Sequence, residues 1–337
     1  MSSTPRRFPR LRLAAIIVAA ALGALLIILL ALALIPESPG DVASHPDPAG
    51  DYATAVRRVA AINAQEQQGI LPACRTQLLT HGSQSAVSVV LFHGWSNCPR
   101  QFLELGQQLY DQGANVLILR EPHHGFTDAS GRQMGGIDNL GGISAEGLRR
   151  YAETAVDIAD GLGRERRVLG LSMGGVLAAW VAQNRPDVER VVAVAPALQL
   201  AAIPGFANPL FANAFGRIPD ISIAGSDPDT VDHAYSGTST RSLASMLLLG
   251  RSVREQAAAT APAVRAITVD TNAADDVVVN SAADQLAADW AAHGADVQTF
   301  EFPAADALPH DVIDVQKAAA NPGLVYPVLL KQLGFAS

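Results

Sequence analysis

The sequence is poor in cysteine, and it lacks several motifs that define large classes of enzyme. Two cysteines among 337 residues are too few for an all-cysteine zinc site or for a scaffold held by several disulfides. No HExxH, GxxxxGK(S/T) or GxGxxG string occurs in the chain. These absences remove the sequence support for a metalloprotease, a P-loop NTPase or a dinucleotide-binding enzyme, and no metal site is expected.

Positive charge is also scarce. The chain has 24 Lys and Arg against 32 Asp and Glu, which gives a formal net charge of -8. Four of the arginines precede the first acidic residue of the chain, at Arg6, Arg7, Arg10 and Arg12. The remainder is therefore more acidic than the whole. It lacks the net positive charge that nucleic acids favour in their partners, so we expect no nucleic-acid partner.

One long stretch is entirely without charge and without proline, from Leu13 to Ile35. As a helix it would extend roughly 35 Å at about 1.5 Å per residue, enough to cross a bilayer. We expect an uncleaved transmembrane anchor, because the apolar core of a signal peptide is shorter. The alternative is a cleaved signal, since Ala31-Leu32-Ala33 resembles a cleavage site. The arginines before the span place residues 1–12 in the cytoplasm and everything after the span outside it.

Beyond the span, composition divides the chain further. Residues 36–50 hold four prolines and two glycines, which predicts a semi-rigid linker. Residues 51–337 are long enough for one large hydrophobic core. Inside this body, residues 200 to about 260 interrupt the regular pattern with several prolines, and an insertion of this size between strands is expected to form a lid.

The rest of the body alternates short apolar runs with amphipathic segments. Strands are predicted at 87–92, 115–120, 167–171, 190–195, 265–270 and 296–302. Helices are predicted at 51–68, 99–112, 144–161, 173–184, 242–258 and 281–293. Strands and helices that alternate at these lengths imply an α/β fold, with a mostly parallel central sheet and helices on both faces.

A GxSxG string, Gly170-Leu171-Ser172-Met173-Gly174, lies between a predicted strand and a predicted helix. In such a nucleophile elbow, small residues at Gly170 and Gly174 allow a sharp turn that holds the serine Oγ in an exposed position. The alternative is a glycine-rich turn without chemistry. The strand before the string and the helix after it favour Ser172 as a catalytic nucleophile.

A serine nucleophile needs a general base, most often an imidazole oriented by a carboxylate. His310 follows the last predicted strand, at the carboxyl edge where open α/β sheets bind ligands. Two adjacent acids, Asp275 and Asp276, follow the preceding predicted strand, and only one of them can orient the imidazole. Four other histidines are expected at the surface: His45, His81, His233 and His293.

Acyl transfer also needs donors for the developing oxyanion. The backbone amide of Met173, directly after the serine, is one candidate, and the amide of Trp95 in the loop His93-Gly94-Trp95-Ser96 is the other. We expect the side chain of His93 to brace that loop. His123 and His124 end another strand at the same edge, where we expect them to line the pocket or support a loop, since further zinc ligands are absent.

Taken together, LFHGWSNCP, GLSMGG, an acid after the next-to-last strand and PHD after the last make residues 51–337 resemble an α/β-hydrolase. The order Ser172, Asp275, His310 is the order that this family uses. The strings are most similar to bacterial carboxylesterases and monoacylglycerol lipases, including membrane-anchored members. Family members carry the acid as D-x-x-V, which selects Asp275 over Asp276.

The resemblance implies a serine hydrolase that cleaves a carboxylic ester of a small molecule or lipid without a cofactor. Ser172 attacks, His310 moves the proton, and Asp275 orients the imidazole. The alternatives are an acyltransferase, a peptidase or amidase with the same residues, or a binding protein that keeps the fold without turnover.

The resemblance also implies a disulfide between Cys74 and Cys98, which a group of membrane-anchored members carries at similar positions. Both cysteines follow the predicted span, in a compartment where disulfides persist. The alternative is two separate buried thiols.

Overall fold

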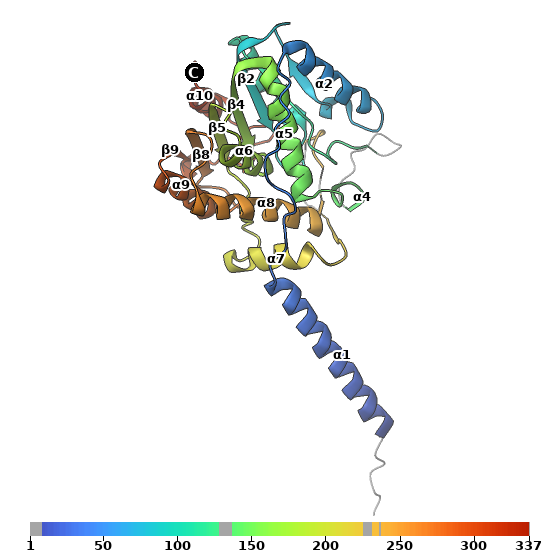
Figure 1. The fold of residues 1–337 in the computed structure, drawn as a ribbon. Helices are drawn as coiled ribbons and strands as arrows, with labels where there is room; N and C mark the ends of the chain where they lie inside the picture. Colours follow the sequence, from blue (N-terminus) through green and yellow to red (C-terminus); the bar gives the residue numbers. More distant parts are fainter. Residues whose placement is uncertain (1–8, 128–136, 225–230, 236, 337) are drawn as a thin grey trace, which may run out of the picture.

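The computed structural model describes residues 9–127, 137–224, 231–235 and 237–336. Most of the basic N-terminus expected over residues 1–12 lies outside this range. A central sheet runs through the body, flanked by helices, and the long helix α1 (Pro9–Leu34) projects away from it (Figure 1). The body and α1 are therefore distinct in shape as well as in composition.

In the described part of the chain, the central sheet has seven strands in the order β1-β3-β2-β4-β5-β8-β9. Their bounds are β1 (Gln77–Leu79), β2 (Ser85–Phe92), β3 (Asn115–Ile118), β4 (Gly163–Leu171), β5 (Arg190–Val194), β8 (Ala266–Asn272) and β9 (Asp296–Phe302). Only β1 is antiparallel to its neighbour; the other pairings are parallel. The predicted α/β fold with a mostly parallel sheet is confirmed.

Helices cover both faces of this sheet. The larger ones are α2 (Tyr52–Gln65), α3 (Leu103–Asp111), α5 (Ala145–Leu162), α6 (Met173–Asn184), α8 (Thr240–Ala259), α9 (Asn280–Ala292) and α10 (Pro322–Gln332), with the short α4 (Ile137–Leu140) before α5. Helices α5, α6 and α8 pack against one another on one face. On the other, the end of α3 is joined to the chain after α10 by a hydrogen bond from the Gln112 amide to the Ala336 carbonyl. The strand ends between these layers position the site described below.

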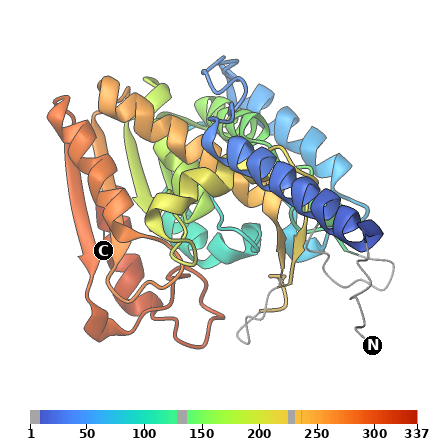
Figure 2. The same ribbon diagram turned by 90° about the horizontal axis from the view of Figure 1, so that it is seen from below.

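The insertion predicted over residues 200–260 contains short elements followed by one long helix. They are the 3-10 turn Gly205–Ala207, α7 (Asn208–Phe215), the small hairpin of β6 (Ser222–Ile223) and β7 (Thr238–Ser239), and α8. Helix α7 lies between α1 and the body (Figures 1 and 2). Its role as a lid stays a prediction.

Residues 36–50, the predicted semi-rigid linker, lie along the body and are held there by hydrogen bonds. The indole of Trp180 donates to the carbonyl of Val42 at 2.8 Å, and the amide of Asp47 donates to the carboxylate of Asp157 at 2.9 Å. Ala49 is buried, and its amide donates to the Asp157 carbonyl. The segment is irregular in conformation but fixed in position, since the acids of α5 supply acceptors for its backbone.

Helix α1 contains a stretch, Leu13–Leu34, that is long and apolar enough to cross a membrane. None of this stretch is buried against the rest of the protein.

Candidate active site

Ser172 lies on the turn between β4 and α6, with φ 60° and ψ −113°. Residues other than glycine rarely adopt a positive φ, and holding such a residue in this conformation costs on the order of 1–3 kcal/mol. The neighbouring glycines make the turn possible. A Cβ on Gly170 would lie 2.0 Å from the Gly174 carbonyl oxygen, and one on Gly174 would lie 2.1 Å from the Phe92 carbonyl oxygen. The turn therefore has the strain and the close backbone contacts of a nucleophile elbow.

His310 lies in the loop after β9 and contacts the loop after β8. Its Nδ1 is 2.6 Å from Oδ2 of Asp275, whose side chain is fully buried. The other carboxylate oxygen of Asp275 accepts hydrogen bonds from the amides of Val277 and Val278. Burial acts to raise the pKa of Asp275, but these hydrogen bonds outweigh it and lower that pKa below its usual value. The carboxyl is thus ionised at neutral pH, so it accepts a hydrogen bond from Nδ1–H of His310.

Asn272, at the end of β8, ties these two loops together. Its amide nitrogen donates to the carbonyl oxygens of Leu308 and Pro309 at 3.0 and 3.1 Å. Pro309 directly precedes His310, so a residue of one strand end fixes the backbone beside the imidazole. The orientation of the ring therefore depends on the sheet as well as on Asp275.

A cavity of about 560 Å³ opens at this edge of the sheet. Ser172, His310 and Trp95 all line it, and so does Asp276. Nε2 of His310 is buried and has no hydrogen-bond partner in the described part of the protein. The ring therefore has one nitrogen bound to Asp275 and the other available to a group in the cavity. Asp276 lies on the cavity wall, and the carboxylate that bonds the imidazole is that of Asp275.

Trp95 lines the same cavity, and Met173 directly follows Ser172 as the first residue of α6. Within the described ranges, neither amide donates to a protein acceptor. The start of α6 leaves its first N–H groups without intrahelical partners, which is how the Met173 amide is left free. Two unpaired N–H groups near a serine provide the kind of donors that an oxyanion needs.

A side-chain bridge that was not predicted from the sequence joins the loop of Trp95 to the loop of His310. Gln101 accepts from the Gly94 amide at 2.7 Å and donates to the Asp311 carboxylate, also at 2.7 Å. Gln101 is buried, and burial of the Asp311 carboxyl together with neighbouring Asp314 raises the pKa of Asp311. The only sequence signal for Gln101 is an amide side chain shortly after the HGW string.

His93 is fully buried and braces its loop, as predicted. Its Nε2 accepts from the Glu121 amide at 3.0 Å, and burial lowers the pKa of the ring well below its usual value. His124 is likewise buried, with Nδ1 bonded to the Pro122 carbonyl at 2.9 Å. Among the described residues, no group of three or more His, Cys, Asp or Glu could hold a metal ion.

The predicted surface position of His233 is wrong. Its side chain is 3 % exposed, and its Nε2 lies 2.7 Å from the carboxylate of Asp314, which also accepts from Asn97. A histidine in an insertion is usually exposed, but here the loop after β9 offers it a buried carboxylate. His45, His81 and His293 are exposed, as predicted.

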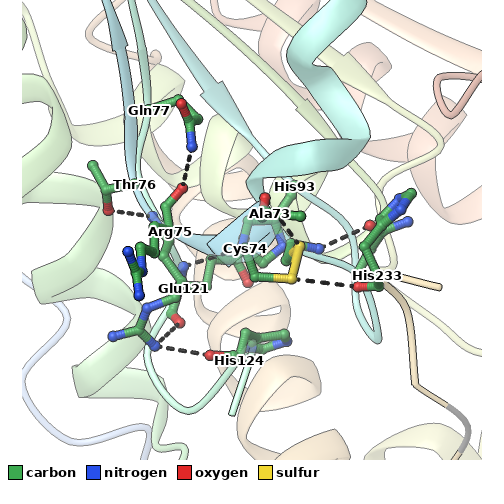
Figure 3. The surroundings of a disulfide bond; sticks show 12 residues. Ala73, Cys74, Arg75, Thr76, Gln77, His93, Glu121, His124 and His233 are labelled. Carbon is green, nitrogen blue, oxygen red and sulfur yellow. Dashed lines mark hydrogen bonds between the residues drawn. A yellow bond between two sulfur atoms is a disulfide. The ribbon is translucent and has the colours of Figure 1, made fainter. Parts of the chain in front are cut away.

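Cys74 and Cys98 form a disulfide, with Cα atoms 5.0 Å apart. Figure 3 shows it beside His93, Glu121 and His124, with the backbone oxygen of His233 close to a sulfur atom. Asn97 precedes Cys98, and its side-chain nitrogen donates to the carboxylates of both Asp311 and Asp314. The disulfide is thus connected through Asn97 to the loop that carries His310.

Comparison with known proteins agrees with this architecture. The structures that the chain resembles include three lipolytic enzymes, which show a shared fold at low identity. One, from a study of the metagenome-derived lipolytic enzymes LipS and LipT, is 17 % identical with a TM-score of 0.58, covering 78 % of this chain and 98 % of the other. A monoacylglycerol lipase of Paleococcus ferrophilus is 18 % identical with a TM-score of 0.56, covering 77 % and 97 %. A monoglyceride lipase of Saccharomyces cerevisiae is 11 % identical with a TM-score of 0.58, covering 77 % and 90 %.

No curated protein sequence matches the chain. The family described as serine aminopeptidase, S33, matches residues 83–304, more than half of the sequence. This range includes the elbow, the loop of Trp95 and the acid after β8. The chain therefore belongs to the serine aminopeptidase S33 family (Hydrolase_4), a family of α/β-hydrolases.

Proposed function

We propose that this protein hydrolyses carboxylic esters with Ser172 as nucleophile, His310 as general base and Asp275 as the residue that orients the imidazole. One observation carries the proposal. His310 bonds a buried, ionised Asp275 through Nδ1, and its unpaired Nε2 lies at a cavity that also holds the elbow serine. In the described part of the chain, His124 also has an unpaired Nε2, but its other nitrogen bonds a backbone carbonyl and it does not line this cavity. A general base needs a free nitrogen within reach of the nucleophile, and His310 meets that need with a carboxylate on its other nitrogen.

The reaction follows from these positions. Nε2 of His310 takes the Ser172 proton as Oγ attacks the ester carbonyl, and the amides of Trp95 and Met173 bind the resulting oxyanion. When the intermediate collapses, the imidazolium gives its proton to the departing alcohol and an acyl-enzyme remains. Water then attacks the acyl carbonyl while the same imidazole takes its proton. The Oγ–acyl bond breaks, the imidazolium returns that proton to Oγ, and the acid leaves a restored Ser172. No cofactor takes part in these steps.

The substrate in this proposal is a small acyl ester or lipid. Ile223 and Val277, two partly exposed aliphatic residues, line the cavity together with Trp95. An apolar wall of this kind suits an acyl chain. The wall also contains Asp276 and Lys317, so the head group has polar partners within reach.

A panel of water-soluble p-nitrophenyl esters of graded acyl length, assayed with the parent and Ser172→Ala, tests the proposal. We expect the parent to turn over at least one ester, and Ser172→Ala to lose several orders of magnitude while its melting temperature is preserved. An aminoacyl p-nitroanilide in the same panel tests the aminopeptidase activity that the family description names. Addition of an alcohol acceptor tests acyl transfer. Ordinary ester turnover by Ser172→Ala would refute the mechanism.

We also propose that α1 anchors the protein in a membrane, with the N-terminus inside and the hydrolase body outside the cytoplasm. Length and apolarity support the span, and a disulfide is in keeping with an oxidising compartment. The mass of the mature N-terminal peptide distinguishes an anchor from a cleaved signal. Recovery of residues before Ala33 in the membrane fraction is expected, and a mature chain that begins after Ala33 would contradict the anchor.

A further inference from the structure

The C-terminal end of α1 is bound by side chains that come about 180 residues later in the sequence. Arg217, just after α7, donates to three backbone oxygens, those of Leu32, Ile35 and Pro36, at 3.0, 2.5 and 2.6 Å. Asn213, within α7, donates to the carbonyl of Ala33 at 2.9 Å. The last carbonyls of a helix lack intrahelical partners, and here a guanidinium and an amide satisfy them.

Arg251 of α8 completes this arrangement. Its guanidinium donates to the side-chain oxygen of Asn213 at 2.7 Å and also to the backbone oxygen of Glu37. The carboxylate of Glu37 pairs with Arg217, and the Glu37 amide donates to Asn213. We call Asn213, Arg217 and Arg251 the α1 clamp. It joins the end of α1 to two helices of the insertion, so α1 and the body are held in one orientation.

The position of the clamp fixes which part of the body lies nearest the membrane. If α1 spans the bilayer, residues 32–37 lie at its outer surface, where a helix end leaves the hydrocarbon. Helix α7 contacts α1 and carries part of the clamp, so it lies at the same depth (Figures 1 and 2). A flexible tether would leave this depth undefined, but residues 36–50 are held along the body.

The segment around α7, residues 204–223, also carries exposed apolar side chains. We call it the cap segment. Phe206 is 81 % exposed directly before α7, and Ile221 and Ile223 are 51 % and 38 % exposed after it. Val277, 42 % exposed, adjoins the same region, since its carbonyl accepts from the Ala201 amide. Outside the apolar stretch 13–35, these residues and Phe300 are the large apolar side chains that the described part of the chain exposes most.

Two of these residues connect the surface to the cavity. Ile223 and Val277 both line the cavity that holds Ser172 and His310. The apolar surface therefore continues from the cap segment to the mouth of the cavity. Clustered apolar side chains of this kind mark membrane or protein contacts, and here the adjoining element is a helix suited to a bilayer.

We infer that the α1 clamp holds the cap segment on the outer surface of the bilayer, and that the cavity takes its ester directly from the lipid layer. The inference rests on the proposed hydrolase function and membrane span. It assigns the substrate class as an amphiphilic ester that resides in a membrane, and it makes α1 a part that positions the enzyme on its substrate.

The first arm of the test compares two substrates on full-length protein reconstituted into phosphatidylcholine vesicles. One is a long-chain monoacylglycerol in the bilayer, and the other is a short, water-soluble p-nitrophenyl ester. For Arg217→Ala we expect about tenfold lower turnover of the bilayer ester, because the variant loses the charge-assisted hydrogen bonds to the end of α1. Turnover of the soluble ester should change less than about twofold. Arg254→Ala is the matched control, because Arg254 lies on α8 next to the clamp without a bond to residues 31–37.

The second arm measures the surface directly. Phe206→Trp in vesicles that contain brominated phosphatidylcholine should show quenched fluorescence relative to the parent. Gln84→Trp should not, because Gln84 precedes β2 at the amino edge of the sheet, away from the cavity. This arm leaves the clamp intact, so it decides the matter if Arg217→Ala proves unstable and loses activity on both esters.

An unquenched Phe206→Trp overturns the inference, whatever the activity ratio. An equal effect of Arg217→Ala on both esters in a stable protein also overturns it. If the parent hydrolyses neither ester while Phe206→Trp is quenched, the proposed function fails and the surface placement stands.

Discussion

Two shielded histidine–aspartate pairs lie near the cavity, and their hydrogen bonds are almost equal in length. His310 and Asp275 are 2.6 Å apart, and His233 and Asp314 are 2.7 Å apart. The surroundings differ. His310 is 16 % exposed, lines the cavity with Ser172, and has a free Nε2, whereas His233 is 3 % exposed and joins the insertion to the loop after β9. The distance between ring and carboxylate therefore does not distinguish a general base from a structural histidine, whereas a place on the cavity wall beside Ser172 does.

The largest expected effect separates the two histidines. His310→Ala should lower kcat for a soluble ester by about 10⁴-fold with little change in melting temperature, because it removes the base and leaves the fold intact. His233→Ala should leave kcat within about tenfold but destabilise the fold by about 3–5 kcal/mol, since it leaves Asp314 buried without its partner. Kinetics and thermal unfolding of both variants check this. Greater loss of turnover in His233→Ala would reverse the assignment.

The adjacent acids provide the second comparison. Asp275→Asn should lower kcat by about 10²- to 10⁴-fold, because an amide cannot stabilise the imidazolium as a carboxylate does. Asp276→Asn should change it less than about tenfold, since Asp276 lies on the cavity wall. Steady-state kinetics at several ester concentrations measure both. A larger effect from Asp276 would move the orienting role by one residue.

Gln101 tests whether the bridge between the two loops matters to turnover. Gln101→Leu should lower kcat by about ten- to a hundredfold with a smaller change in KM, because the loop of Trp95 loses its link to Asp311. Gln107→Leu, on the exposed face of α3, is the matched control. A change in KM alone, or in melting temperature alone, would show that Gln101 serves binding or stability.

The disulfide contacts His233 directly and is linked to the loop of His310 only through Asn97. Cys98→Ser should lower the melting temperature, because the closed loop of 25 residues stabilises the fold by at most about 3.5 kcal/mol in the chain-entropy account. Turnover should fall only a few-fold, through looser positioning of Trp95. A thiol count on unreduced, denatured protein should find no free thiols, and two would contradict the disulfide.

The smallest effect concerns pH. Burial raises the pKa of Asp314, but the hydrogen bond with His233 and those from other donors outweigh it, so the net shift is downward. A carboxyl whose pKa is lowered by folding stabilises the protein above its unfolded pKa, and this stability is lost as pH falls through the folded value. Asp314→Asn should therefore show a smaller drop in melting temperature from about pH 5 to pH 3 than the parent. An equal drop would assign the acid sensitivity elsewhere.

The elements that sequence predicts well are those whose pattern is local. The strand at 296–302 and the helix at 173–184 match β9 and α6. Valine, threonine and phenylalanine, which favour strands, mark the first, and a long apolar run after the elbow marks the second. The edge strand β1 and helix α10 were not predicted. β1 is only three residues long, and α10 contains Pro327 in its interior, which breaks the usual signal.

The same contrast holds for the candidate site, where local motifs are predictable and contacts between distant loops are not. The elbow at Ser172 is encoded in five consecutive residues, and the strand order places His310 and the two acids at one edge. Gln101 and His233 could not be identified, because their partners are 210 and 81 residues away in the sequence. Buried polar bonds between loops have no periodicity, so only the folded chain reveals them. The catalytic roles of Ser172, Asp275 and His310 stay predictions.

Covalent labelling tests the central claim most directly. The folded protein is treated with a fluorophosphonate and the modified peptide is mapped by mass spectrometry. We predict one adduct, on Ser172, that is absent in Ser172→Ala and strongly slowed in His310→Ala, since the base activates the nucleophile. Labelling that is equally fast in Ser172→Ala, or an adduct on another serine, would contradict the account.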